Sequence, residues 1–122
     1  MIKNYQDLDV YRRSYSLSLE INKLAEELPQ KEHHILGNQI KKASCSVPFN
    51  IIGGFGKKEH VKDFLSSIHV ALGSNTEMIL NLKLMNSLNY LPNQNYQRFL
   101  TEYTIVGKQL GVLIKSWRKF IK

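Results

Sequence analysis

The sequence has 122 residues, of which 43% are hydrophobic and 22% charged, so a largely disordered chain is excluded. A chain of this length fits one domain, expected to span residues 1–122. No apolar run approaches the roughly 18–20 residues of a membrane span, and the polar N-terminus lacks the apolar core of a signal peptide. Cys45 has no second cysteine for a disulfide within the chain. A soluble, cytoplasmic protein with no membrane partner is expected.

The net charge of +7 is distributed unevenly along the chain. Residues 31–58 carry a net charge of +4 and residues 93–122 a net charge of +5, whereas residues 1–30 and 59–92 each carry −1. Two segments therefore hold all of the excess, which favours a polyanionic partner over uniform solubilising charge. An ordinary solvated lysine surface remains the alternative interpretation.

The first half of the chain contains two stripes of apolar residues at the three- and four-residue spacing of a helix. They predict helices over residues 8–28 and 33–53. Asp7 is the expected N-cap of the first helix, and Pro29 is expected to end it. The stripes consist of Val10, Ser14, Leu17, Ile21, Leu24 and Leu28, followed by Leu36, Ile40, Ala43, Val47, Ile51 and Gly54.

The second predicted helix contains Pro48 in its interior. An interior proline costs roughly 3 kcal/mol through a lost hydrogen bond and a ring clash, so this helix is expected to bend. Gly53, Gly54 and Gly56 are expected to form the helix end and the following turn, where glycine permits a positive φ.

The second half of the chain predicts two longer helices, over residues 60–88 and 94–121, with Asn93 as a possible cap of the last one. Their stripes are Val61, Phe64, Ile68, Ala71, Asn75, Met78, Leu82 and Met85, then Tyr96, Phe99, Tyr103, Val106, Leu110, Leu113, Trp117 and Phe120. Short connections between long helices favour antiparallel neighbours. The sequence therefore predicts an all-α fold, an up-down-up-down antiparallel four-helix bundle with a proline-bent second helix. Glycines inside the helical patterns are interpreted as sites of close helix contact: Gly37, Gly73, Gly107 and Gly111.

No pattern of residues indicates an enzyme, a catalytic group, a metal site or a cofactor. The segment 53–58 is glycine-rich, but it neither follows a strand nor ends in lysine followed by serine or threonine, as a phosphate loop does. Cys45 is interpreted as a packing residue. The histidines fit no common metal-ligand spacing and lie at His33, His34, His60 and His69.

Basic residues are the candidate binding groups for nucleic acid. Lys108, Lys115 and Lys122 recur every seven residues and share one face of the last helix. Flexible ammonium groups suit phosphate neutralisation, which positions a nucleic acid without reading its bases. Tyr103, Trp117 and Phe120 are assigned to the core, so no exposed stacking aromatic is expected. The nine candidates are Lys41, Lys42, Lys57, Lys58, Lys108, Lys115, Arg118, Lys119 and Lys122.

Several motifs in order resemble those of the four-helix-bundle family of 23S rRNA intervening-sequence-encoded proteins, which includes the accessory variability determinant of diversity-generating retroelements. They are Asp7 to Tyr11, the Gln-hydrophobic-basic-basic-Ala motif at Gln39 to Ala43, Ser46 to Ile51, the Gly-aromatic-Gly-basic turn at Gly54 to Lys57, and Gly73-Ser74 with Glu77. Two positions depart from the family: Gly53 replaces a usual glutamate, and Lys42 a more frequent arginine, which loses bidentate phosphate geometry.

The resemblance implies a homopentamer of four-helix protomers with a basic surface and no enzymatic activity. In the retroelement branch it implies binding of RNA together with a reverse transcriptase. The leading hypothesis is a non-catalytic oligomeric accessory protein that binds the phosphate backbone of RNA or DNA. The alternative is a protein-interaction scaffold of the intervening-sequence type with no direct nucleic-acid role. The sequence does not choose between the two branches.

Overall fold

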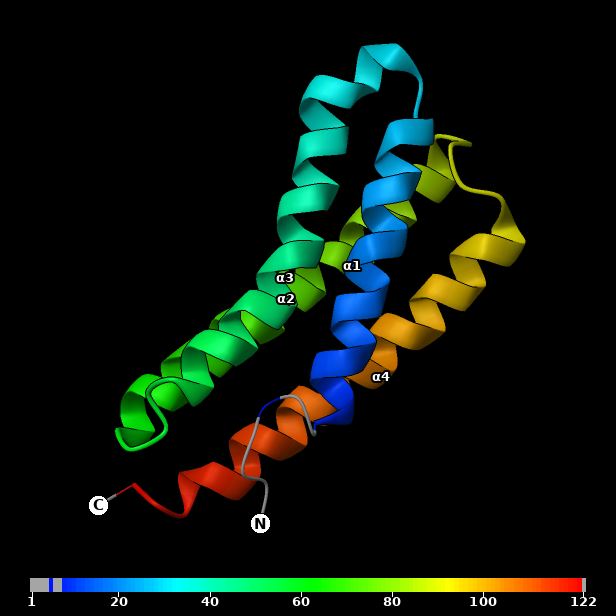
Figure 1. Cartoon of the computed structure of the whole chain (residues 1–122). Helices are drawn as coiled ribbons and strands as arrows, with labels where there is room; N and C mark the ends of the chain where they lie inside the picture. Colours follow the sequence, from blue (N-terminus) through cyan, green and yellow to red (C-terminus); the bar gives the residue numbers. More distant parts are fainter. Residues whose placement is uncertain (1–4, 6–7, 122) are drawn as a thin grey trace.

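The computed structural model describes residue 5 and residues 8–121, which form four helices lying side by side (Figure 1). Successive helices run in opposite directions, and the described residues contain no strand. The predicted all-α, up-down-up-down bundle is therefore confirmed. The helices are α1 (Asp9–Glu27), α2 (Asn38–Phe55), α3 (Val61–Ser87) and α4 (Asn93–Arg118).

The connection between α1 and α2 is itself helical. α1 ends at Glu27, and its C-cap, Leu28, is followed by Pro29 as expected. A proline disfavours the helical conformation in the residue before it. A 3₁₀ turn, η2 (Gln30–Glu32), and a π-helical turn, η3 (His33–Gly37), then lead into α2. The chain is thus helical from residue 33 as predicted, but its first turn is wider than an α-helix.

The turn between α3 and α4 closes in a Schellman motif. Asn89 takes a φ of 64°, and the Tyr90 amide donates to the Met85 carbonyl at 2.8 Å. The expected cap by Asn93 is wrong, because Asn93 is the first residue of α4 and Pro92 takes the cap position. The expected cap at Asp7 lies outside the described residues.

Pro48 lies inside α2, as predicted. The ribbon of this helix changes direction along its length, so that its second half leans away from α1 while it stays beside α3 (Figure 1). An interior proline produces such a bend because its ring clashes with the preceding turn. The Asn50 side chain donates to the carbonyl and the hydroxyl of Ser46, at 2.8 and 3.0 Å, beside the bend.

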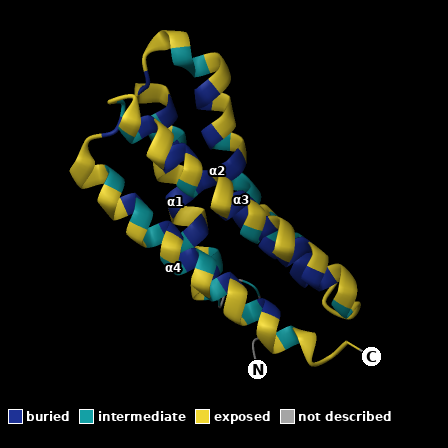
Figure 2. Cartoon of the chain, turned by 180° about the vertical axis from the view of Figure 1, so that it is seen from behind, coloured by how far each residue is buried: buried dark blue, intermediate teal, exposed yellow. Residues whose placement is uncertain are grey.

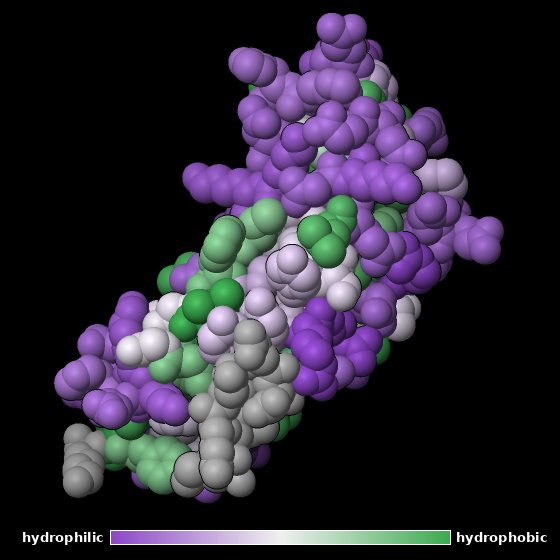
Figure 3. All heavy atoms as spheres, in the orientation of Figure 1, coloured by the Kyte–Doolittle hydropathy of each residue, from purple (hydrophilic) through white to green (hydrophobic). Residues whose placement is uncertain are grey.

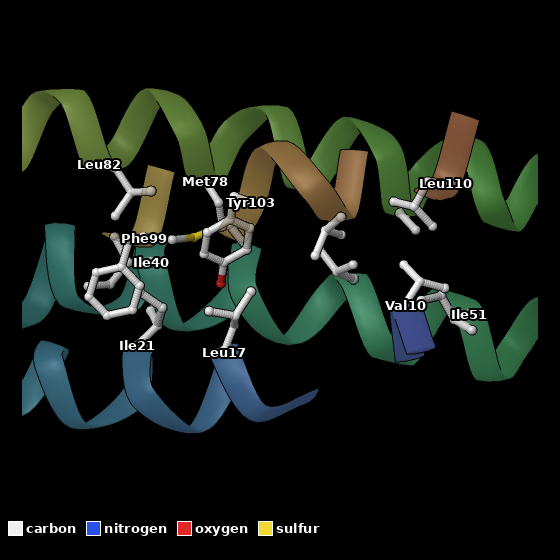
Figure 4. Close-up of a cluster of buried hydrophobic side chains, with 14 of the residues drawn as sticks. Val10, Leu17, Ile21, Ile40, Ile51, Met78, Leu82, Phe99, Tyr103 and Leu110 are labelled. Atoms are coloured by element: carbon white, nitrogen blue, oxygen red, sulfur yellow. The ribbon is translucent and has the colours of Figure 1, made fainter. Parts of the chain in front are cut away.

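The four predicted stripes face one hydrophobic core, and the opposite faces are exposed (Figure 2). Every residue of the α2 stripe is buried, and Phe64, Ile68, Met78 and Leu82 of α3 are fully enclosed. Figure 4 shows the Tyr103 ring of α4 within a cluster of side chains from all four helices, beside Met78 of α3 and Leu17 of α1. The prediction fails at Phe120, whose side chain is 53% exposed.

The glycine predictions need correction. Gly53 and Gly54 continue α2, and Gly56 has a φ of −65°, so none of the three takes a positive φ. A Cβ built on Gly73 or Gly111 would meet nothing within 4 Å, so neither allows a close helix contact.

Two other glycines do lie at tight contacts between helices. A Cβ on Gly107 would come within 3.1 Å of the Asn75 side-chain nitrogen, which donates to the Tyr103 carbonyl at 2.9 Å. A Cβ on Gly54 would come within 3.2 Å of Ile68 Cδ1. The close approach of α2 to α3 therefore occurs at a glycine that the sequence pattern assigned to a turn.

Candidate nucleic-acid interface

The α2–α3 turn (residues 56–60) and the last two turns of α4 lie at the same end of the bundle (Figure 1). Phe55, just before that turn, packs against Trp117 near the end of α4, with ring centroids 6.3 Å apart. Two basic segments that are far apart in the sequence therefore meet. We call this region the basic end; its cations are Lys57, Lys58, Lys62, Lys115, Arg118 and Lys119.

Among the residues that the structure describes, carboxylates are fewer than cations at the basic end. Glu59 lies in the turn and Asp63 in the first turn of α3, against six basic side chains, all of which are exposed. Lys57 donates to the Ser67 hydroxyl at 3.2 Å. The basic end therefore carries an excess of positive charge in contact with solvent, where it attracts anions by an amount that depends on ionic strength.

Helix geometry gives a local reason for part of this charge. Lys115 and Arg118 lie in the last turn of α4, where the helix dipole leaves partial negative charge on the unpaired carbonyls. Cations there stabilise the helix end by typically 0.3–1 kcal/mol each at low ionic strength. This role accounts for two of the six cations and does not apply to the lysines of the α2–α3 turn.

The structure separates the predicted basic residues of segment 31–58 into two pairs. Lys41 and Lys42 lie in the first part of α2, about 20 Å along the helix from its last residue at 1.5 Å per residue, whereas Lys57 and Lys58 lie beyond that end. Lys41 is half-buried and its ammonium pairs with Glu26 Oε1 at 2.8 Å, so α1 partly neutralises it. These two lysines are therefore not part of the basic end.

The remaining candidates lie along α4. Lys108 is exposed two helical turns before Lys115, in a groove that it shares with Asp9 of α1. Lys122 lies outside the described residues. Lys108 thus extends the positive charge of the basic end along α4.

An aromatic cluster lies beneath the basic end. The Trp117 ring stacks on Phe64 with centroids 4.1 Å apart, and Phe55 and Phe120 meet it edge to face. A cleft of about 500 Å³ opens beside this cluster, and Lys58 and Lys119 line it together with the aromatic rings. In Figure 3, hydrophobic and hydrophilic atoms lie next to each other on the surface at this end of the molecule.

Sequence reasoning placed Phe120 in the core because its spacing continues the α4 stripe. The helix ends at Arg118, so Phe120 lies beyond the last turn in which that spacing points inward. The Lys119 ammonium lies 5.4 Å from the centroid of the Phe120 ring. A run of cations around an aromatic residue at the end of a helical pattern is the signal that could have identified it.

The motif residues of α2 and α3 form a second polar feature, away from the basic end. The Gln39 side-chain amide donates to the Asn81 side-chain oxygen, and the Ser74 hydroxyl donates to that of Ser46 at 2.7 Å. Lys42 and Glu77 line a cleft of about 420 Å³ along the same seam, together with Gln39, Ser46 and Ser74. These hydrogen bonds fix the alignment of the two helices. A Cβ built on Gly53 would meet nothing within 4 Å, so the packing there leaves room for a side chain to begin.

The described residues form neither a metal site nor a membrane-spanning helix. Among residue 5 and residues 8–121, no three histidine, cysteine or carboxylate side chains lie together as a metal site would require. None of the helices within this part of the chain is both long and apolar enough to span a membrane.

Comparison with known proteins identifies relatives of this chain. The sequence model of the 23S rRNA-intervening sequence protein family matches residues 6–112. A solved structure of a protein of unknown function, from the S23 ribosomal protein family of Bacteroides thetaiotaomicron VPI-5482, is similar with a TM-score of 0.80. The match covers 87% of this chain and 98% of that chain at 22% identity, so it shows the fold alone. No curated protein matches the sequence.

Proposed function

This chain belongs to the family of 23S rRNA-intervening sequence proteins, and from that premise we propose a non-catalytic accessory protein that binds RNA through phosphate contacts at its basic end. The observation that carries the proposal is the meeting of two basic segments at one end of the bundle, where the described residues include six exposed cations and two carboxylates. Lysine-rich surfaces neutralise phosphates without reading bases, so the proposed binding is strong at low salt and weak in sequence preference. The proposed place of action is the cytoplasm.

We propose that the protein works as a ring of identical protomers. A closed ring needs two different faces on each protomer, because its contacts are heterologous. Two exposed apolar faces support this: one on α1 and α2 with Tyr15, Leu19 and Phe49 between 49% and 69% exposed, and one on α3 with Val70 and Leu80 at 50% and 66%. The number five, and a reverse transcriptase as a further partner, rest on the family resemblance.

Other apolar residues of α3 and α4 contribute little to either face. Leu65 and Ile114 are buried inside the protomer, and Leu72 and Ile79 pack partly against its core. Assembly would repeat the basic end around the ring, which multiplies the positive field that a long polyanion meets.

The same apolar faces support a second candidate, a protein-interaction scaffold whose basic end meets an acidic partner protein. Both candidates predict an assembly, and only the first predicts affinity for RNA that falls steeply with salt. Nucleic-acid binding is therefore the property that separates them.

The test is charge reversal at the basic end. The double variant Lys115→Glu and Lys119→Glu should weaken binding to a structured RNA and flatten its salt dependence, while the helical spectrum and the assembly mass stay unchanged. A matched control reverses Lys23 and Lys83, exposed lysines toward the opposite end of the bundle, with the same change in net charge. Equal loss of binding in both double variants would show a net-charge effect and contradict a localised interface.

Light scattering after gel filtration tests the ring. A mass near five protomers is expected, and Leu80→Glu on the exposed α3 face should reduce it without loss of helical signal. A monomer mass at micromolar concentration would rule the ring out.

A further inference from the structure

We infer that the cleft at the basic end holds an unpaired base of single-stranded nucleic acid, stacked on Phe120 with its phosphates on Lys58 and Lys119. This inference rests on the proposed function and adds a recognition mode to it. Phosphate contacts alone would not distinguish a single strand from a duplex, whereas a stacked base requires an unpaired strand.

The cleft has the size and the lining that such a ligand requires. Its volume of about 500 Å³ lies within the roughly 300–1,000 Å³ of small-molecule sites. Its wall includes Phe55, Trp117 and Phe120, and Trp117 is fixed on its inner side by stacking on Phe64. The aromatic wall is therefore held in place by core packing before a ligand binds.

Phe120 is the ring that is accessible to a base. Its side chain is 53% exposed, which is unusual for an aromatic residue that continues a core stripe. It meets Trp117 edge to face, with centroids 5.7 Å apart, so the inner neighbour does not cover its face by stacking. The Lys119 ammonium lies over the Phe120 ring, 5.4 Å from its centroid, so a base that stacks on that face displaces the ammonium toward the phosphate joined to the base.

The positive charges that line the cleft favour a nucleotide over a purely apolar ligand. Lys58 and Lys119 line the cleft from the α2–α3 turn and from the end of α4, so an occupant meets positive charge from both sides. Single-stranded nucleic acids present flat aromatic bases at regular spacing along a polyanionic backbone, and proteins bind them with aromatic platforms inside basic grooves. An acidic peptide with an aromatic side chain is the competing occupant.

Trp117 is the single tryptophan of the chain, so its fluorescence reports on this cleft alone. Fluorescence titrations would use a short single-stranded oligouridylate, an RNA duplex of equal length, inorganic polyphosphate and an acidic peptide that contains phenylalanine. We expect the oligouridylate to change Trp117 fluorescence and to bind more tightly than the duplex at equal salt. Polyphosphate should bind with little spectral change.

Two substitutions of Phe120 distinguish stacking of a base on the ring from a contact that any apolar side chain could make. Phe120→Ala should weaken oligouridylate binding by about 5-fold or more and leave polyphosphate binding unchanged, because base stacking contributes this order of affinity. Phe120→Leu keeps an apolar side chain but removes the ring, and it should behave like Phe120→Ala. Val112→Ala removes an exposed apolar side chain elsewhere on α4 and should change nothing.

The outcomes separate this inference from the proposed function. Binding of polyphosphate and of the duplex with no preference for the single strand would overturn the base site. Wild-type affinity of Phe120→Ala for the oligouridylate would overturn it as well. Either result would leave phosphate binding standing. Tighter binding of the acidic peptide than of the oligouridylate would assign the cleft to a protein partner. The absence of binding to every polyanion at low salt would reject both the site and the proposed function.

Discussion

Replacing Gly73 by alanine should stabilise the protein, whereas replacing Gly54 by alanine should not. Both glycines lie inside helices, where alanine is favoured by about 1 kcal/mol. At Gly73 a methyl group meets nothing within 4 Å, so Gly73→Ala should stabilise the protein by about 1 kcal/mol. At Gly54 the methyl group would lie 3.2 Å from Ile68 Cδ1 and 3.4 Å from the Phe64 carbonyl oxygen. Overpacking of this kind costs roughly 1–3 kcal/mol, so Gly54→Ala should be neutral or destabilise by up to about 2 kcal/mol.

Urea unfolding followed by far-UV circular dichroism measures these differences, with all variants at one protein concentration because assembly adds to apparent stability. Gly111→Ala is the matched control in α4, since that position is also exposed and open. It should stabilise as Gly73→Ala does. Equal stabilisation by Gly54→Ala would refute the close α2–α3 contact, and a loss of stability in Gly73→Ala that varies with protein concentration would place a neighbouring protomer on α3.

Two further perturbations concern single hydrogen-bonding groups. Tyr103→Phe should raise the free energy of unfolding by about 1 kcal/mol, since the Tyr103 hydroxyl is buried without a hydrogen-bond partner in the described part of the chain. Tyr90→Phe should lower the Tm, because the Tyr90 hydroxyl donates to Glu32 Oε2 at 2.7 Å. A lower Tm for Tyr103→Phe than for wild type, or a higher one for Tyr90→Phe, would contradict the described contacts. The hydrogen bond from Gln109 lowers the pKa of Asp9, so the Asp9 contribution to stability is present above about pH 4 and is lost as pH falls through its folded value. The Tm difference between wild type and Asp9→Asn should therefore shrink on acidification, and a difference that stays constant down to about pH 2 would contradict this role.

The bundle could be predicted because its helices follow one rule over long stretches. Apolar residues at three- and four-residue spacing are buried from Leu36 to Gly54 and from Phe64 to Met85. Such a stripe leaves one face to pack, and short connections leave antiparallel packing as the simple solution. Pro48 bends α2 as expected because the effect of proline on a helix is local.

Helix ends and helix neighbours were harder to predict, because they depend on contacts that the spacing does not encode. Gly54 extends a helix that its glycine-rich surroundings suggested should stop, since Ile68 and Phe64 of α3 pack against it. Phe120 continues a stripe past the helix end and so becomes exposed. The same limitation applied to the candidate site, where the spacing did not predict that Lys41 pairs with Glu26 of α1.

The salt dependence of RNA binding by the wild-type protein tests the proposed function most directly. Each neutralised phosphate of a single strand contributes about −0.7 to the slope of log affinity against log salt concentration. If at least half of the six cations of the basic end contact phosphates, the slope should be about −2 or steeper. A slope near zero, or no measurable RNA or DNA binding at low ionic strength, would contradict a nucleic-acid role and leave the protein scaffold in its place.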